Sequence, residues 1–357
     1  MKNANFPIFK TKDSEKPQKF DLTDAKQRQD YFAYKAGDEI KKLKDYLKNN
    51  TFIVYLLGKK NSGKGTYAKM FKEIVDPERI EHFSTGDMIR SFDGVLKDEE
   101  KREEFIKFLR KKYRGPVSVE EIIGAMTKRS TAALLPSELI LALTEREIVK
   151  LGRKALFIDG FPRDLDQVSY SLFFKTLINY REDPDIFVLI DVPANVIDER
   201  IRYRVVCPLC QTSRNLKLLA TKNVERDKQS NKFYLLCDNS DCKGPRMITK
   251  EGDELGVEPI KKRLEKDETL MEQIHKMYGI SKVFLRNSIP ADEVQLFADD
   301  YEITPEFNYV FNEKNNKVEV RQKPWEFKDD RGIVSNSLMP PPVVVSLIKQ
   351  LVKALGI

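Results

Sequence analysis

The stretch from Gly58 to Thr66, which reads GKKNSGKGT, has residue types and spacing suited to holding a chain of phosphates. It fits the pattern of a glycine, four residues, a second glycine and a lysine, and it follows a short apolar run, as a phosphate-binding loop (P-loop) requires. Glycines let backbone N–H groups turn towards phosphate oxygens, and Lys64 can reach the β and γ phosphates. The residues expected to bind the phosphates of a nucleoside triphosphate are Gly58, Asn61, Ser62, Gly63, Lys64, Gly65 and Thr66.

The four cysteines of the chain form two close pairs within 36 residues. Two residues separate Cys207 from Cys210, four separate Cys237 from Cys242, and 26 lie between the pairs. Two such pairs suit one tetrahedral Zn²⁺, whereas a disulfide framework scatters its cysteines more widely. Because four protein ligands leave no position for water, we expect a structural zinc that stabilises a small lid without a core of its own. Reduced cysteines without a metal are the alternative.

Arg200 and Arg204 are four residues apart in a segment expected to be helical, so they should share one face of that helix. Ile197 and Ile201 can bury the opposite face. The planar fork of arginine binds phosphate oxygens in pairs, which suits two polyanionic substrates that must be held together. A solvated basic stripe is the competing interpretation.

Asp159 ends the apolar run Ala155–Asp159 and precedes Gly160. Open α/β sheets bind ligands beyond the carboxyl ends of their strands, so this carboxylate stands where a ligand is expected. A carboxylate that only caps a helix or a loop is the alternative. The two histidines, His82 and His275, lie in no pattern of nucleophile and base, and transfer to an anionic phosphate oxygen needs no general base.

Hydrophobic patterns predict the elements that would position these residues. The apolar runs Thr51–Gly58, Ala155–Asp159 and Ile186–Val192 are separated by helical stretches, which predicts a parallel α/β sheet. The other expected elements are a helix from about Asp24 to Leu47, a helical insertion within residues 91–134, a hairpin in Phe307–Val320, and a last helix from about Val343 to Leu355 that Gly356 closes.

Three further strings accompany the P-loop in order along the chain. They are FSTGDMIR (Phe83–Arg90), FIDGFPRDLDQ (Phe157–Gln167) and DERIRYRVVCPLC (Asp198–Cys210). Together with the P-loop they resemble the adenylate kinase family over most of residues 51–275, apart from the insertion. The resemblance implies an α/β fold of the P-loop NTPase type, with a parallel sheet flanked by helices, an inserted monophosphate-binding flap and a zinc-containing lid.

The resemblance also implies a role for individual residues. The implied catalytic cations are Lys64, Arg90, Arg163, Arg200, Arg204 and Arg263. Arg200 would also contact ATP, Arg163 would grip the phosphate of AMP, and Gln167 would read its base. The implied AMP-binding residues are Thr85, Arg90, Gly160, Arg163 and Gln167. Asp87 and Asp159 would hold Mg²⁺ through its water shell.

The chain departs from the family pattern at two places that bear on catalysis. Lys60 and Asn61 stand in the P-loop where the family usually has proline and glycine, and asparagine tolerates the left-handed backbone that the turn needs. The family's R-x-D-D hinge after the lid is weakly kept, with Lys250, Gly252 and Asp253 as the nearest match. A lysine at this hinge could not make the two-point contact of an arginine.

The expected domain boundaries follow from these motifs. They are an N-terminal helical extension at 1–50, a P-loop kinase core at 51–83, 135–204 and 251–357, a monophosphate-binding flap with the insertion at 84–134, and a zinc lid at 205–250. No motif marks the loop that would hold the adenine of ATP, and DDRGIVSNS (Asp329–Ser337) is a candidate for it.

The reaction that we expect is reversible transfer of the γ-phosphate of ATP to AMP, giving two ADP. The resemblance implies that Thr85 together with Gln167 favours AMP, because pyrimidine-specific relatives tend to have alanine and asparagine at these positions. A kinase of UMP and CMP, or of several monophosphates, is the near alternative. A zinc-ribbon protein that binds nucleic acid and uses the P-loop as a switch is a more distant one. The cysteine region lacks the interleaved aromatic platforms that such binding uses.

The bulk composition excludes few classes of protein. With 41% hydrophobic residues in 357 the chain is globular, and a net charge of +7 from 63 basic and 56 acidic side chains decides little. No apolar run reaches the roughly 18 residues of a membrane span, and Met1–Phe20 lacks a signal-peptide core. We expect a cytoplasmic monomer that binds ATP and AMP with Mg²⁺ and structural Zn²⁺, and that engages neither membrane nor nucleic acid.

Overall fold

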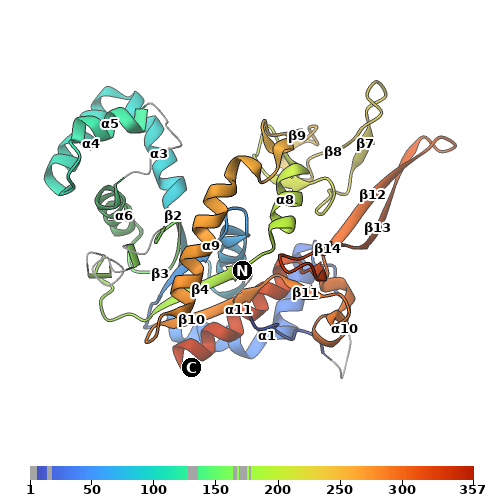
Figure 1. Cartoon of the computed structure of the whole chain (residues 1–357), viewed down its shortest axis with the longest axis horizontal. Helices are drawn as coiled ribbons and strands as arrows, with labels where there is room; N and C mark the ends of the chain where they lie inside the picture. The colour runs from blue at the N-terminus through green and yellow to red at the C-terminus, as the bar shows by residue number, and fades with distance from the viewer. Residues whose placement is uncertain (1–5, 14–17, 128–135, 164–166, 169–174, 177) are drawn as a thin grey trace.

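A five-stranded parallel sheet lies at the centre of the structure, with its strands in the order β10-β4-β1-β3-β2 (Figure 1). The computed structural model describes residues 6–13, 18–127, 136–163, 167–168, 175–176 and 178–357. The five strands are β1 (Ile53–Gly58), β2 (Ile80–Ser84), β3 (Ala155–Asp159), β4 (Asp185–Asp191) and β10 (Ser281–Arg286). Every neighbouring pair is parallel, which confirms the sheet predicted from the apolar runs.

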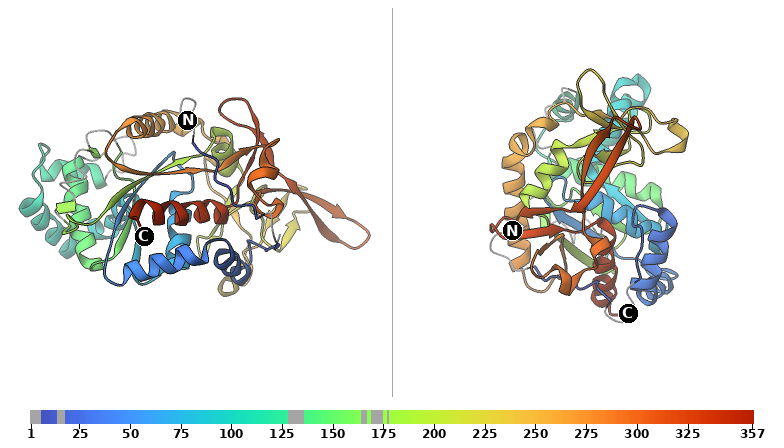
Figure 2. Two further views of the ribbon diagram at one scale, coloured as in Figure 1. Left: turned by 90° about the horizontal axis from the view of Figure 1, so that it is seen from below. Right: turned by 90° about the vertical axis from the view of Figure 1, so that its right-hand side faces the viewer.

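Alternate residues of β1 point to opposite faces of the sheet and divide the core in two. Val54 and Leu56 pack with helices on one face, and Tyr55 and Leu57 pack with helices on the other. The helices are α1 (Ala25–Leu47), α2 (Lys64–Val75) and α11 (Pro340–Leu355) on the first face, and α6 (Ser137–Leu151) and α9 (Lys261–Lys276) on the second. Figure 2 shows α1 and α11 side by side. Because helices cover both faces, the strands read as continuous apolar runs.

The N-terminal segment joins this core through α1. The carboxylate of Asp24 accepts hydrogen bonds from the N–H groups of Lys26 and Gln27, each at 3.0 Å, and so caps the helix at the expected place. Tyr31 and Phe32 are fully buried in the same cluster as α2 and α11. Residues of the expected extension therefore contribute to the central hydrophobic core.

The described part of the expected insertion is helical. Its helices are α3 (Thr85–Lys97), α4 (Glu99–Lys112) and α5 (Val119–Thr127), which form a lobe beside α6 (Figure 1). The Phe92 and Phe105 rings stack with their centroids 4.7 Å apart and hold α3 against α4. The expected end of the flap at residue 134 lies outside the described residues.

The lid consists of short antiparallel strands between α8 (Ala194–Arg202) and α9. The strands are β5 (Arg204–Val206), β6 (Ser213–Asn215), β7 (Val224–Arg226), β8 (Phe233–Leu235) and β9 (Ile248–Thr249). A short 3₁₀ helix at Ser240–Cys242 lies between β8 and β9, and two more follow β9 at Asp253–Leu255 and Glu258–Ile260. The apolar cluster under these strands is small, and three of the four cysteines are among its buried members.

A long segment between β10 and α11 contains a hairpin that contacts the lid. Its elements are β11 (Ser288–Pro290), α10 (Val294–Phe297), a 3₁₀ helix at Asp300–Glu302, β12 (Pro305–Asn312), β13 (Lys317–Pro324), β14 (Glu326–Lys328) and β15 (Val334–Ser337). Strands β12 and β13 form the expected hairpin, with Tyr309 opposite Val320. The Tyr309 ring lies 5.6 Å from that of Phe233 in the lid. Gly356, with a φ of 70°, ends α11 as expected.

Candidate nucleotide site and cysteine cluster

The P-loop joins the end of β1 to the start of α2. Asn61 has a φ of 65°, which confirms that this asparagine adopts the left-handed conformation, and Gly63 has a φ of 101°. A side chain at Gly63 would bring its Cβ within 2.9 Å of the Tyr67 ring. Gly63, the N-cap residue of α2, has no side chain that could cap the helix, so the first N–H groups of this 12-residue helix can bind an anion.

The side chain of Lys64, the first residue of α2, folds back across the loop. Its Nζ donates hydrogen bonds to the carbonyl oxygens of Gly58 at 2.7 Å and Lys59 at 3.1 Å. Burial lowers the pKa of Lys64, and the nearby carboxylate of Asp159 opposes that shift. The ammonium group thus lies between the P-loop and the end of β3.

Two arginines from distant parts of the chain, Arg163 and Arg263, lie close enough to Lys64 to lower its pKa. Burial lowers the pKa of Arg163, and the nearby charges of Arg263 and Arg90 act in the same direction. Asp159 opposes that shift. The structure therefore brings together four of the six expected cations, which start from α2, α3, the loop after β3, and α9.

Asp267 belongs to the same group, although the sequence analysis did not select it. It lies one turn after Arg263 on α9, and its Oδ2 accepts a hydrogen bond from the N–H of Lys60 at 3.0 Å. Burial raises the pKa of Asp267, while the positive charges of Lys64, Arg263 and Arg163 oppose the shift. Its spacing of four residues from Arg263 on a helix was the available sequence signal.

Arg200 reaches the P-loop from α8. Its Nη1 donates to the carbonyl oxygens of Asn61 at 3.3 Å and Ser62 at 3.2 Å. Ile197 and Ile201 are buried on the other face of α8, as expected. The guanidinium group therefore lies beside the loop that would hold a phosphate chain.

The expectation that Arg204 shares a helical face with Arg200 is wrong. Helix α8 ends at Arg202, and Arg204 begins β5, whose residue Val205 is buried in the lid. The change from helix to strand carries the Arg204 side chain to Asp253, with which it makes hydrogen bonds of 2.7 and 2.6 Å. Helical spacing failed here because the pairing of β5 with β6 and β9 overrides it.

The backbone after β3 packs closely against Thr85 and Arg163, two residues that are expected to bind the monophosphate. Thr85 is fully buried and its hydroxyl donates to the carbonyl oxygen of Asp159 at 3.1 Å. Gly160 has a φ of 90°, and a Cβ there would lie 2.3 Å from Thr85 Oγ1 and 3.1 Å from Arg163 Nη2. Arg163 Nε donates to the Gly160 carbonyl oxygen at 2.8 Å. Only glycine fits at this position without displacing both neighbours.

Both ends of the Gln167 amide are bound within the protein. Its Oε1 accepts the backbone N–H of Arg163 at 2.7 Å, and its Nε2 donates to Ser137 Oγ at 2.8 Å. The side chain is buried beside the proposed monophosphate site. These two bonds use one of the two N–H groups and one of the two acceptor lone pairs of the amide.

Asp87 and Asp159, the expected magnesium residues, both lie close enough to His82 to influence its pKa. Asp87 forms an ion pair with Arg90. Burial alone would raise the pKa of Asp87, but hydrogen bonds from Arg90 and Ser84 outweigh it and lower the pKa. Two carboxylates near a phosphate loop are a donor set that suits hydrated Mg²⁺.

The four cysteines meet at one point in the lid. All four Sγ atoms lie within 4.8 Å of one another, and those of Cys210 and Cys237 are 3.7 Å apart. Tetrahedral zinc with Zn–S bonds of about 2.3 Å separates its sulfurs by about 3.8 Å. A hydrogen bond with Thr212 lowers the pKa of Cys210 to about 6, and burial raises that of Cys242 to about 12. The cluster fits a structural metal ion.

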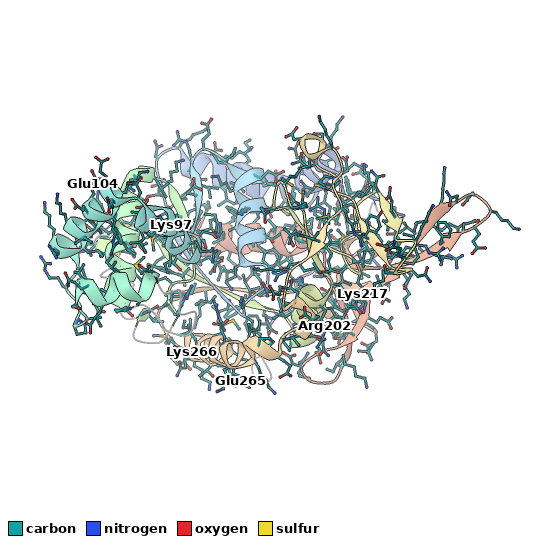
Figure 3. All side chains as sticks on the ribbon, turned by 90° about the horizontal axis from the view of Figure 1, so that it is seen from above. Lys97, Glu104, Arg202, Lys217, Glu265 and Lys266 are labelled. Atoms are coloured by element: carbon teal, nitrogen blue, oxygen red, sulfur yellow. The ribbon has the colours of Figure 1, made fainter. Side chains whose placement is uncertain are left out.

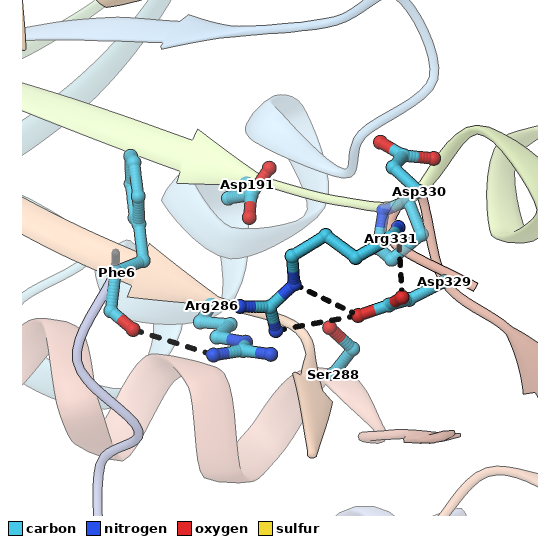
Figure 4. Close-up of a pocket in the computed structure, with 8 residues that line it drawn as sticks. Phe6, Asp191, Arg286, Ser288, Asp329, Asp330 and Arg331 are labelled. Atoms are coloured by element: carbon cyan, nitrogen blue, oxygen red, sulfur yellow. Dashed lines mark hydrogen bonds and ion pairs between the residues drawn. The ribbon is translucent and has the colours of Figure 1, made fainter. Parts of the chain in front are cut away.

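The candidate adenine segment, Asp329–Ser337, lies next to the P-loop. Asp330 Oδ2 is 3.0 Å from Lys59 Nζ. Arg331 pairs with Asp329 at 3.3 Å (Figure 4). Asp329, Asp330, Arg331 and Arg286 are among the residues that line a cavity of about 10 Å³ (Figure 4). That volume matches a single water molecule, so this cavity does not hold an adenine.

Within the described ranges, none of the helices has the length and apolar character needed to cross a membrane.

Comparisons with known proteins relate the chain to one enzyme family. No family model matches it. It is 31% identical over 202 residues to an adenylate kinase of Thermotoga petrophila, a match that spans 57% of this chain and 74% of the relative. It is 35% identical over 171 residues to an adenylate kinase of Kosmotoga olearia, spanning 48% and 67%, and 29% identical over 221 residues to one of Hydrogenobaculum, spanning 61% and 84%.

Proposed function

Because the chain belongs to the adenylate kinase family and is a nucleoside monophosphate kinase, we propose that it transfers the γ-phosphoryl group of ATP reversibly to AMP, giving two ADP. The observation that carries the proposal is the convergence of Lys64, Arg163 and Arg263 on the space beside Asp159. A ring of fixed cations offsets the repulsion between two polyanions held end to end.

The two substrates would approach this ring from opposite sides. The phosphates of ATP would bind the uncapped N-terminus of α2 and Lys64, and the phosphate of AMP would bind Arg163 and Arg90. Strands β1 and β3 are neighbours, with Leu56 opposite Asp159, so the two phosphate sites open side by side. The acceptor oxygen is already anionic, and catalysis then requires alignment and charge stabilisation rather than a general base.

The proposed metal ions have separate tasks. Mg²⁺ would offset the charge of the ATP phosphates, with its water shell held by Asp87 and Asp159. Zn²⁺ bound by the four cysteines would hold the lid strands together without touching substrate. Closure of that lid would bring Arg204 to the phosphates, where Arg200 already lies beside the P-loop, and exclude water as a competing acceptor.

A coupled assay of the purified protein tests the proposal. ATP and Mg²⁺ would be supplied with AMP, GMP, CMP, UMP or dTMP in separate reactions. We expect the highest kcat/KM with AMP, and tight inhibition by a compound that joins two adenosines through five phosphates.

The other outcomes identify the alternatives. Preferred turnover of UMP or CMP would refute the assignment of AMP while keeping the reaction class. Binding of oligonucleotides without any phosphate transfer would refute the proposal as a whole.

A further inference from the structure

Lys59 lies in the P-loop but contacts carboxylates of the protein. Its side chain is only 3% exposed, and its Nζ lies 3.2 Å from Glu268 Oε2 and 3.0 Å from Asp330 Oδ2. Burial alone would lower the pKa of Lys59, but the two carboxylates outweigh burial and raise it, so the ammonium stays charged. A lysine held in this way neutralises two half-buried acids and is not available to a phosphate.

The next P-loop residue repeats the same connection through its backbone. Lys60 donates its N–H to Asp267 at 3.0 Å, and Asp267 directly precedes Glu268 on α9. Two consecutive P-loop residues are therefore bound by two consecutive acidic residues of one helix. The backbone bond requires a residue with an N–H at position 60, which proline lacks.

The connection extends to a second helix through Asp330. Its Oδ1 accepts the N–H of Ala194 at 2.8 Å, at the start of α8. Helix α8 carries Arg200, and α9 carries Arg263 one turn before Asp267. Three elements that supply phosphate-facing cations are thus joined by one set of contacts.

We propose that Lys59, Lys60, Asp267, Glu268 and Asp330 form a latch that positions the P-loop against α8 and α9, so that Lys64, Arg200 and Arg263 meet one phosphate chain. The inference rests on the proposed function. These are positioning residues: they act through the P-loop and the two helices. Displacing a reacting group by about 1 Å can cost on the order of a hundredfold in rate.

The hydrogen bond between Lys60 and Asp267 offers the sharpest test, because each partner can be removed separately. Asp267→Ala removes the acceptor and Lys60→Pro removes the donor. We expect each variant to lower kcat/KM for ATP at least tenfold, with the double variant no worse than the poorer single variant. Asp267→Asn, which keeps an acceptor oxygen at the same reach, should recover most of the loss.

Glu265→Ala is the matched control. Glu265 is an exposed acid on the same helix, and it lies on the outer side of α9 (Figure 3). This variant should keep wild-type kcat and KM. If Lys60→Pro does not fold, the Asp267→Ala and Asp267→Asn pair carries the test alone.

Three measurements separate positioning from simple stabilisation: the melting temperature, binding of a non-hydrolysable ATP analogue, and kcat and KM for each nucleotide. The latch predicts a loss in ATP-analogue affinity and kcat at temperatures where the variants are fully folded. Any of three results would overturn the latch: additive losses of kcat/KM in the double variant, equal losses in Asp267→Ala and Asp267→Asn, or wild-type kinetics in Asp267→Ala. Wild-type protein that binds the ATP analogue but phosphorylates no monophosphate would instead refute the proposed function.

Discussion

Arg204 and Asp253 join the first strand of the lid to the 3₁₀ helix at its end through two hydrogen bonds, Nε to Oδ2 at 2.7 Å and Nη2 to Oδ1 at 2.6 Å. Asp253 is buried, so the pair is partly shielded from water. The contact closes the base of the lid. It also occupies an arginine that is proposed to contact ATP, so binding of the phosphates would have to compete with Asp253.

Arg204→Lys tests the importance of this two-point contact. Lysine keeps the charge but cannot make both hydrogen bonds, so we expect faster proteolysis within the lid and a kcat lowered by about tenfold or more. Arg214→Lys is the control, because Arg214 makes a similar fork with Asp238 away from the hinge. Equal proteolysis and equal kcat in the two variants would contradict the assigned role.

Gly160→Ala should impair binding of the monophosphate. Positive φ strains a non-glycine residue by about 1–3 kcal/mol, and the new Cβ would also clash with Thr85 Oγ1. We expect KM for AMP to rise about tenfold or more, while affinity for an ATP analogue changes little. Gly152→Ala separates strain from the clash, because Gly152 has a φ of 69° and none of the described residues places an atom within 4 Å of its Cβ position. Gly152→Ala should lower the stability of the protein and leave KM for AMP unchanged.

Metal removal should loosen the lid before the core. The lid has few buried apolar residues besides its cysteines, whereas the two clusters on the central sheet do not involve the metal site. Metal analysis should find one Zn²⁺ per chain, and chelation should make residues 205–250 sensitive to protease while the core stays folded. Cys242→Ser should reproduce the effect. Unchanged lid proteolysis after complete metal removal would refute a structural zinc.

The environment of His82 leads to a prediction of how the stability of the protein depends on pH. Its pKa is lowered in the folded protein, chiefly by burial, and its Nε2 has no hydrogen-bond partner within the part of the chain that the structure describes. The unfolded chain binds a proton at His82 more readily than the folded chain does. The stability that the folded protein has while His82 is neutral is therefore fully present above about pH 6.5, and it is lost as pH falls below that value. We expect the free energy of unfolding, measured with urea, to fall less between pH 7.5 and pH 5.5 in His82→Gln than in the wild-type protein. The same loss in both proteins would exclude His82 as the cause.

Local sequence patterns predicted the elements that hold the nucleotide site. The P-loop, β3, β4, α1, the β12–β13 hairpin and α11 lie where apolar runs, helical spacing, Asp24 and Gly356 placed them. These signals work because strand and helix periodicity and capping depend on neighbouring residues. Helical spacing misplaced Arg204, because strand pairing within the lid decides the conformation there.

The amino-acid order alone determined which residue types are available: a glycine-rich loop with a lysine, two pairs of cysteines, and arginines in recognisable strings. Tertiary structure decided which of them meet. Asp267 and Asp330 lie 207 and 271 residues from their P-loop partners, and no periodicity links such distant positions. Their contacts arise because the fold packs α9 and the loop between β14 and β15 against the P-loop, where burial makes an unpaired charge costly.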